Sequence, residues 1–394
     1  MRLKSRYFIQ YILCVAFFFM VSCEKDENEP EKVRTLMVYL AGNNNLSGHL
    51  KNNIKDMASA WKKSYNGDIV IFFDGSGSTP QLLTFKVKDG VVEQEVLKTY
   101  DELNSASPET LKQVVKDMQA LYPSDSYGMI FGSHATGWIP SSLLGRAERS
   151  LYQIENPLTR SFATDGASTM DIRDMAAAIP DGMDFIVFDA CLMSSIETLY
   201  EFRNKAKYVI ASPAETPAPG FPYAKMMSYF WREGDRLESD LKEVCKIFYE
   251  YYNTYNSSDR FGTIALINMS ELDNLYDLTC QVLEGKAPEA AQMGKNDVYN
   301  YPKVEYDKYD RFFDLREYIR YMTVNDAVLR AAYEDLLGKV VLYKAVTDPF
   351  YRTTIPVEKF SGISTYIPRS EWYDETKAYW KFPWAGIYGK DATE

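Results

Sequence analysis

The sequence predicts an α/β protein in which a mostly parallel β-sheet is covered by helices on both faces. Short apolar runs alternate with segments of helical periodicity, and this alternation is typical of parallel sheets. Apolar residues make up 46% of the 394 residues, which is enough for a large core. The apolar runs that we interpret as strands are Thr35–Leu40, Ile69–Phe73, Met129–Phe131, Phe185–Phe188, Tyr208–Ala211 and Thr263–Ile267.

Local signals place a hairpin and several helices between these strands. Apolar residues alternate ahead of Asp89-Gly90, a dipeptide that favours a two-residue hairpin turn, so we expect a hairpin at an edge of the sheet. Ser107 supplies an N-cap, and the proline that follows it a first turn, for a helix ending at Leu121. A second helix is expected to begin near Asp171.

The N-terminus predicts an export signal over residues 1–22. Basic residues up to Arg6 precede an apolar stretch that is too short for a stable membrane span. The segment ending at Cys23 is similar to a bacterial lipobox, which implies that Cys23 is lipid-modified; ordinary signal cleavage is the alternative. We therefore expect a lipid-anchored protein of the outer membrane or cell surface, with residues 23–33 as an acidic, flexible tether.

We divide the mature chain into a sheet domain, residues 34–268, and a C-terminal α+β subdomain, residues 269–394, that packs on it. The second part contains a tyrosine-rich stretch over residues 299–306 and a helical pattern around residues 315–322. The formal net charge is −11, and such an acidic chain is a poor partner for nucleic acid. We expect a monomer.

A histidine and a cysteine each follow a predicted strand. The chain has only two histidines, and His134 follows the strand that ends near Phe131, whereas Cys191 closely follows the next one. Ligands of open sheets bind outside the carboxyl ends of the strands, so both residues are expected at one edge. Each alone is more often structural. Together they favour nucleophilic catalysis by a thiol.

The remaining cysteines do not suggest a metal site or disulfides. Cys245 and Cys280 lie in helical patterns, where buried cysteines are common. No Cys or His cluster has the spacing of zinc ligands, so we predict no structural metal.

Two motifs around His134 and Cys191 carry a family resemblance. Residues 133–138, Ser-His-Ala-Thr-Gly-Trp, match a His-Gly-x-Gly-Trp pattern, and residues 188–197, which begin Phe-Asp-Ala-Cys-Leu-Met, match an Asp-Ala-Cys-Leu-Met pattern. Both resemble the clostripain family of cysteine endopeptidases. The separation of 57 residues is close to the roughly 50 of caspase-type proteases. The resemblance covers most of the mature chain and implies a caspase-like sheet and peptide hydrolysis.

The resemblance also implies roles for the residues of the two motifs. The Cys191 thiolate attacks the scissile carbonyl and His134 protonates the leaving amine. Backbone N–H groups of Ala135 and Cys191 are expected to hold the oxyanion, and a helix beginning near Leu192 would favour the thiolate. Ala135 departs from the usual glycine, and a positive φ there would cost about 1 kcal/mol. Asn43, where many relatives carry Asp, is interpreted as a turn residue.

Specificity in the resembled family is for Arg or Lys before the cleaved bond, which requires an acidic pocket. Asp189 matches the family position at the base of that pocket; capping of backbone N–H groups is its alternative role. Glu215, after the next strand, is a second pocket candidate. Trp138 is a candidate wall of the site, although an aromatic residue in a loop is as often part of the core.

Some relatives cut themselves between the two motifs. The segment 141–165 is polar and contains Arg146, Arg149 and Arg160, so we expect activating cleavage after Arg146 or Arg149. Calcium is used by some relatives, but no segment resembles a calcium-binding loop, and we assign no cofactor. The alternative function is an inactive surface lipoprotein of the same fold that binds protein or glycan through exposed tyrosines.

Overall fold

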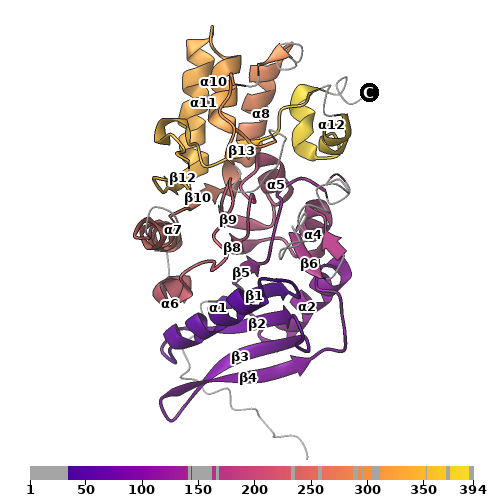
Figure 1. Ribbon diagram of the computed structural model, residues 1–394, viewed down its shortest axis with the longest axis vertical. Helices are drawn as coiled ribbons and strands as arrows, with labels where there is room; N and C mark the ends of the chain where they lie inside the picture. Colours follow the sequence, from indigo (N-terminus) through magenta and orange to yellow (C-terminus); the bar gives the residue numbers. More distant parts are fainter. Residues whose placement is uncertain are drawn as a thin grey trace, which may run out of the picture. The chain divides into compact units, whose positions relative to one another are not determined.

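The computed structural model describes eleven stretches of the chain (Figure 1), which are residues 34–140, 143, 162–165, 168–231, 236–255, 260–286, 292–294, 296–302, 311–351, 353–369 and 373–389. The predictions on the export signal, Cys23, the tether, Arg146, Arg149 and Arg160 lie outside these residues. Within them, no helix is both long and apolar enough to cross a membrane.

A nine-stranded sheet forms the centre of the fold, in the order β12-β10-β9-β8-β5-β1-β2-β3-β4. The five strands from β9 to β2 are parallel, and the strands at both ends are antiparallel. The strands are β1 (Arg34–Gly42), β2 (Gly67–Gly75), β3 (Gln81–Lys88), β4 (Val91–Thr99), β5 (Tyr127–Gly132), β8 (Met183–Asp189), β9 (Ala206–Ala211), β10 (Thr263–Asn268) and β12 (Val341–Val346). All six predicted strands are confirmed.

The predicted hairpin is strands β3 and β4, and it forms one edge of the sheet (Figure 1). Asp89 and Gly90 both have positive φ, 52° and 80°, as a type I′ turn requires. The opposite edge is β12, which comes from the predicted C-terminal subdomain, so residues before and after 268 share one sheet. Two small antiparallel pairs complete the strands: β6 (Phe162–Asp165) with β7 (Ser168–Met170), and β11 (Phe313–Asp314) with β13 (Ser364–Thr365).

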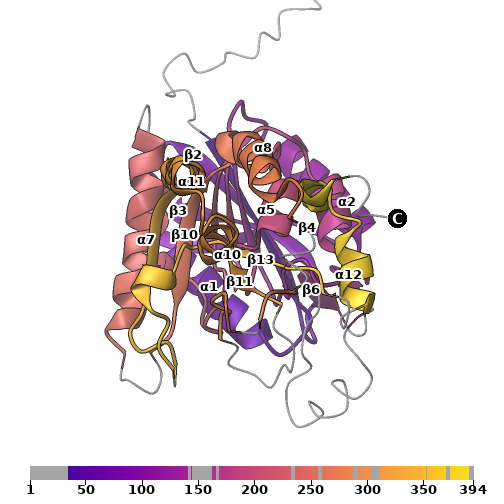
Figure 2. The same ribbon diagram turned by 90° about the horizontal axis from the view of Figure 1, so that it is seen from above.

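Helices cover both faces of the sheet (Figure 2). One apolar cluster holds the side chains that α1 and α7 bury, such as Leu50 and Phe248, and a second holds those of α2, such as Leu111. The helices are α1 (Ser47–Ala60), α2 (Pro108–Leu121), α4 (Ile172–Ala178), α5 (Ile196–Glu201), α6 (Tyr223–Met226), α7 (Leu237–Asn253), α8 (Leu272–Leu283), α10 (Leu315–Met322), α11 (Ala327–Val340) and α12 (Tyr373–Tyr379), with 3-10 turns at Met227–Trp231, Met269–Glu271, Val357–Lys359 and Pro383–Tyr388.

A side-chain cap marks the beginning of one of the two predicted helices, α2. The Ser107 hydroxyl accepts a hydrogen bond from the Thr110 backbone N–H at 3.4 Å, and Pro108 is the first helical residue of α2. The helix expected near Asp171 is α4.

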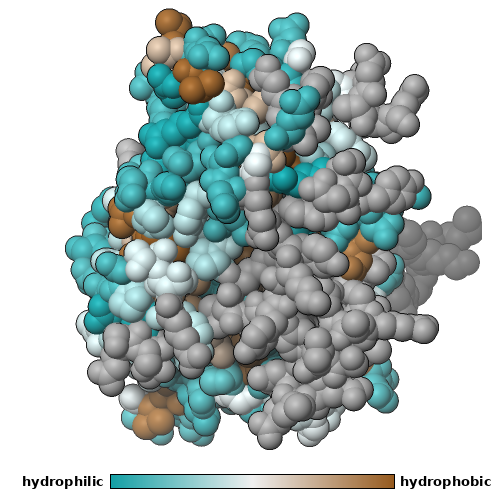
Figure 3. Space-filling model, turned by 45° about the horizontal axis from the view of Figure 1, so that its top comes forward, coloured by the Kyte–Doolittle hydropathy of each residue, from teal (hydrophilic) through white to brown (hydrophobic). Residues whose placement is uncertain are grey.

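On the face shown in Figure 3, apolar residues form only small, separate surface patches among the coloured residues.

Candidate active site

The two catalytic candidates lie at one edge of the sheet, as the sequence predicts. Strands β5 and β8 are parallel neighbours, with Gly132 opposite Asp189. The Ser133 backbone N–H donates to the Asp189 carbonyl at 3.4 Å, so the segments that follow β5 and β8 remain hydrogen-bonded at the end of the sheet. His134 and Cys191 each lie two residues beyond the paired residues. Register therefore brings an imidazole and a thiol to adjacent positions.

His134 is held by a residue that the sequence analysis did not single out. Its Nε2 lies 2.5 Å from Oδ1 of Asn45, which follows β1, the neighbour of β5 on the side away from β8. An amide oxygen only accepts, so with this amide orientation Nε2 carries the proton and Nδ1 is left as the acceptor of the ring. Burial lowers the pKa of His134 to about 4, so the imidazole is neutral at neutral pH and is able to take a proton.

The sulfur of Cys191 accepts a hydrogen bond from the backbone. The N–H of Thr216, in the loop after β9, donates to Sγ at 3.2 Å, and the thiol donates to the Thr216 carbonyl at 3.8 Å. The Leu192 N–H donates to the Ala214 carbonyl at 2.9 Å, which fixes the two loops against each other. An N–H aimed at sulfur favours the thiolate over the thiol. Thr216 is thus a second residue that the sequence analysis missed.

The prediction that a helix begins near Leu192 is wrong. Leu192 has a φ of +61°, in the left-handed region, which a helix cannot contain. Helix α5 begins only at Ile196, after Ser195, whose hydroxyl accepts from the Thr198 N–H at 3.4 Å. The Thr216 amide, and not a helix N-terminus, is the donor at Cys191.

Alanine at position 135 brings no left-handed strain. Ala135 is not one of the described residues with positive φ. The positive φ of this motif is at Gly137, +60°, where a Cβ would lie 2.6 Å from the Leu192 carbonyl oxygen. The Ala163 N–H of β6 donates to the His134 carbonyl at 3.2 Å, next to the bridge between Ala135 and Phe162.

Trp138 does not form a wall of the site. Its side chain is 1% exposed, and its ring packs against those of Tyr366, Tyr379 and Phe382 at centroid distances of 4.7, 6.0 and 6.1 Å. A large apolar ring with three aromatic neighbours gains most from burial, so Trp138 belongs to the core. Its alternative interpretation is the correct one.

Asp189 is a buried carboxylate directly beneath the edge of the sheet. It is 7% exposed, and its Oδ2 accepts from the Tyr223 hydroxyl at 2.9 Å and from the Phe221 N–H at 3.3 Å. Burial raises its pKa to about 6. Gly220, with a φ of +75°, passes close above it: a Cβ there would lie 2.5 Å from Oδ2. Glu215 is half-buried in the same loop as Thr216.

Asn43 does more than form a turn. Its amide nitrogen donates to Oδ1 of Asp165, the last residue of β6, at 2.7 Å, and Oδ2 of Asp165 accepts from the Ser105 N–H at 2.8 Å. The segment 141–165 therefore ends in contact with the loop that follows β1.

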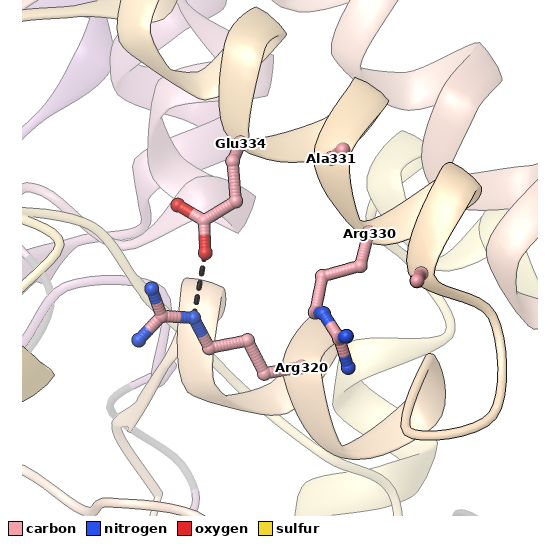
Figure 4. Close-up of a pocket in the computed structure, with 5 residues that line it drawn as sticks. Arg320, Arg330, Ala331 and Glu334 are labelled. Atoms are coloured by element: carbon pink, nitrogen blue, oxygen red, sulfur yellow. Dashed lines mark hydrogen bonds and ion pairs between the residues drawn. The ribbon is translucent and has the colours of Figure 1, made fainter.

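One surface depression of the described residues borders the site, and another lies apart from it. The depression between α10 and α11 contains Arg320 and Arg330. Nε of Arg320 is paired with Glu334 at 2.6 Å (Figure 4), so the charge of Arg320 is neutralised. The other lies along α1 and includes Asn45. No described group of three His, Cys, Asp or Glu side chains is arranged to hold a metal ion.

The fold and the paired residues define the class of caspase-like α/β proteins with a thiol at the edge of the sheet. Residues 38–381 match the clostripain family, and the chain belongs to this family. Clostripain of Hathewaya histolytica is 28% identical over 231 residues, which are 52% of this chain and 43% of clostripain. The match thus spans less than half of that relative.

Several solved structures resemble the whole fold, including these two. One is an inactive zymogen C11 protease from Parabacteroides distasonis, 30% identical with a TM-score of 0.76. The other is a secreted C11 cysteine protease from Bacteroides thetaiotaomicron in complex with an irreversible peptide inhibitor, 26% identical with a TM-score of 0.76. Each alignment covers 91% of this chain and 99% of the other.

Proposed function

We propose that this protein is a cysteine endopeptidase that cleaves peptide bonds after Arg or Lys. The observation that carries the proposal is the register of β5 and β8, which sets His134 and Cys191 at equal offsets beyond Gly132 and Asp189. The family membership and the inhibitor complex of the Bacteroides thetaiotaomicron relative support it.

In the proposed reaction the resting pair is a thiol and a neutral imidazole. His134 accepts the proton of Cys191 as Sγ attacks the scissile carbonyl, and the Thr216 N–H stabilises the charge on sulfur. The imidazolium then gives that proton to the leaving nitrogen, the carbon–nitrogen bond breaks, and water hydrolyses the acyl-enzyme. Asn45 fixes the ring through Nε2, so the exchange takes place at Nδ1.

We assign the oxyanion hole to the backbone N–H groups of Ala135 and Cys191. The ordinary backbone conformation of Ala135 supports this assignment, because alanine keeps the N–H donor of the usual glycine without left-handed strain.

We assign the base of the specificity pocket to Asp189. Its described partners are the Tyr223 hydroxyl, the Phe221 N–H and, at 3.5 Å, the Asn53 amide, all of them neutral, and none of the described Lys and Arg side chains forms an ion pair with it. A buried carboxylate without a cation is costly, and a substrate Arg or Lys would supply the missing charge. Glu215 is the second candidate for contact with the same cation.

Self-cleavage after Arg146 or Arg149 remains part of the proposal, as does a lipid anchor at Cys23. The end of the segment 141–165 supports the first, because β6 is bonded to His134 through Ala163 and to Asn43 through Asp165. A cut in this segment would release a chain end tied directly to the site. The zymogen relative agrees with such a step.

Hydrolysis of peptidyl aminomethylcoumarins with Arg, Lys, Gln or Leu before the bond tests the proposal. The wild type is expected to cleave the Arg and Lys substrates, Cys191→Ala none of them, and Asp189→Asn is expected to lose the preference for a cation. Glu215→Gln should have the smaller effect. Equal rates for the Arg and Gln substrates would contradict the proposed specificity for basic residues. Full activity of Cys191→Ala would contradict the assignment of Cys191 as the nucleophile.

The alternative is an inactive surface lipoprotein of the same fold that binds protein or glycan through the tyrosine-rich stretch 299–306. Tyr301 of this stretch is 1% exposed and part of the core, so it cannot stack on a sugar, whereas Tyr299 is half-buried and Tyr306 lies outside the described residues. The burial of Tyr301 favours the endopeptidase.

A further inference from the structure

One surface feature next to the candidate active site has no role in the proposed reaction. It is the depression lined by Asn45, Gly48, His49, Lys51, Asn52 and Lys55, called the α1 depression below. Five of these residues belong to α1, and the sixth, Asn45, is the residue whose Oδ1 contacts His134. The depression therefore begins directly at the imidazole.

Sheet order fixes on which side of the site the α1 depression lies. The neighbouring strands β9, β8, β5 and β1 end in loops that carry Thr216, Cys191, His134 and Asn45, in that order along the edge. In the proposed reaction His134 protonates the leaving amine, so the leaving half of the substrate lies on the His134 side of Cys191. The α1 depression continues past His134 in the same direction and so faces the residues after the cleaved bond.

The charge of the α1 depression is positive, although the whole chain is acidic. Lys51 and Lys55 form no ion pair with any described carboxylate; Nζ of Lys55 is 3.4 Å from Oδ1 of Asn52, and Nζ of Lys51 is 5.8 Å from the centroid of the Phe73 ring. Asp56, the acid that follows Lys55, is not one of the lining residues. Two cations in a concave surface favour an anionic ligand.

We propose that the α1 depression binds an acidic side chain of the substrate on the leaving-group side of the cleaved bond. The proposal rests on the proposed function and adds a substrate class to it: peptides with a basic residue before the bond and Asp or Glu shortly after it. Gly48 to Lys55 spans about 10 Å of helix at about 1.5 Å per residue. An extended peptide covers that length in about three residues, so the acid lies within the first three residues after the bond.

The test uses pairs of internally quenched peptides that are identical except for Glu or Gln at the second and third positions after a single Arg. The wild type is expected to cleave the Glu peptide with a kcat/KM about two- to fivefold higher, the size typical of solvent-exposed ion pairs. Raising the salt concentration should narrow the ratio. Lys51→Gln with Lys55→Gln should bring it to one, and Lys51→Glu with Lys55→Glu should invert it.

Matched controls separate this charge effect from general damage. Lys112→Gln with Lys116→Gln changes two exposed lysines of α2, on the other face of the sheet, and should leave the ratio at its wild-type value. Peptidyl-arginyl aminomethylcoumarin has no residue after the cleaved bond, so its cleavage reports the catalytic centre alone and is the reference against which the rates of each variant are compared.

The outcomes distinguish the two proposals. If the wild type does not cleave the coumarin substrate, the proposed function fails, and the α1 depression has no substrate to bind. If the coumarin substrate is cleaved but the Glu to Gln ratio is one, or the ratio survives in the Lys51 and Lys55 variants, the binding role of the α1 depression is wrong and the proposed function stands.

Discussion

At the scale of single residues, the contact between Asn45 and His134 decides which ring nitrogen is free to exchange protons. Asn45→Ala is expected to lower kcat by about ten- to a hundredfold, the usual cost of losing a residue that orients a functional imidazole, with a smaller change in KM. Steady-state kinetics with an arginyl peptide over a range of pH measures the effect. Burial lowers the pKa of His134 to about 4. Loss of the Asn45 side chain should expose the imidazole to water, raise this pKa, and so move the acidic limb of the kcat profile to higher pH.

A control for this prediction is Asn52→Ala, which changes an exposed amide of the α1 depression whose hydrogen bond is to Lys55. The same loss of kcat in both variants, or an unchanged pH profile in Asn45→Ala, would mean that Asn45 does not position the ring.

Asp189 illustrates a conflict between function and stability at one residue. Burial raises its pKa from 3.8 to about 6, so the folded state binds a proton more tightly than the unfolded chain. The folded protein therefore loses stability as the pH rises from about 4 through about 6. Two pKa units correspond to about 3 kcal/mol, and Asp189→Asn should recover part of it at about pH 8.

Urea unfolding of both proteins measures this gain. The difference in the free energy of unfolding should be large at about pH 8 and small at about pH 4, where both side chains are neutral in the folded protein. The amide oxygen is able to keep the hydrogen bonds from Tyr223 and Phe221, since both end on the same carboxylate oxygen. Equal stability of the two proteins at about pH 8 would show that the buried charge carries no penalty.

At the scale of elements, the loops that carry His134 and Cys191 are in close contact at Gly137. Its φ is +60°, and a Cβ would lie 2.6 Å from the Leu192 carbonyl, one residue after the thiol. Gly137→Ala should therefore cost more than the roughly 1 kcal/mol of left-handed strain and should also reduce activity. Gly182→Ala is the matched control, because Gly182 has a φ of +81° and open space where its Cβ would be. Equal stability losses would contradict the close contact.

Local sequence signals are sufficient to predict part of the fold, but they do not predict strand β12 or the correct start of helix α5. Hydrophobic patterning and the Asp89-Gly90 turn predict all the central strands and the edge hairpin, because period and turn chemistry are local properties. The positive φ of Leu192 is not local: it depends on the bond between its N–H and Ala214, and it displaces the expected helix. Asn45 and Thr216 lie in loops that follow other strands, and their spacing from His134 and Cys191 in the sequence does not predict the contacts.

At the scale of the whole molecule, strands from before and after residue 268 belong to one sheet, and the described end of the segment 141–165 is hydrogen-bonded to the His134 carbonyl at the edge of that sheet. We predict that wild-type protein converts to two fragments with a gain in activity, and that Arg146→Ala with Arg149→Ala stays a single chain of low activity. Denaturing electrophoresis and a coumarin assay on the same samples measure both. Arg160→Ala is the control and should be cleaved and activated like the wild type. Full activity of the uncut double variant would rule out activation by cleavage.

The central claim is that Cys191 is a nucleophile beside a pocket for a basic side chain. The most direct test is the intact mass of the protein after incubation with a peptidyl-arginine chloromethyl ketone, for the wild type, Cys191→Ala and Cys280→Ala. We predict one adduct on the wild type and on Cys280→Ala, and none on Cys191→Ala. An adduct that persists in Cys191→Ala, or none on the wild type under conditions that label clostripain, would contradict the account.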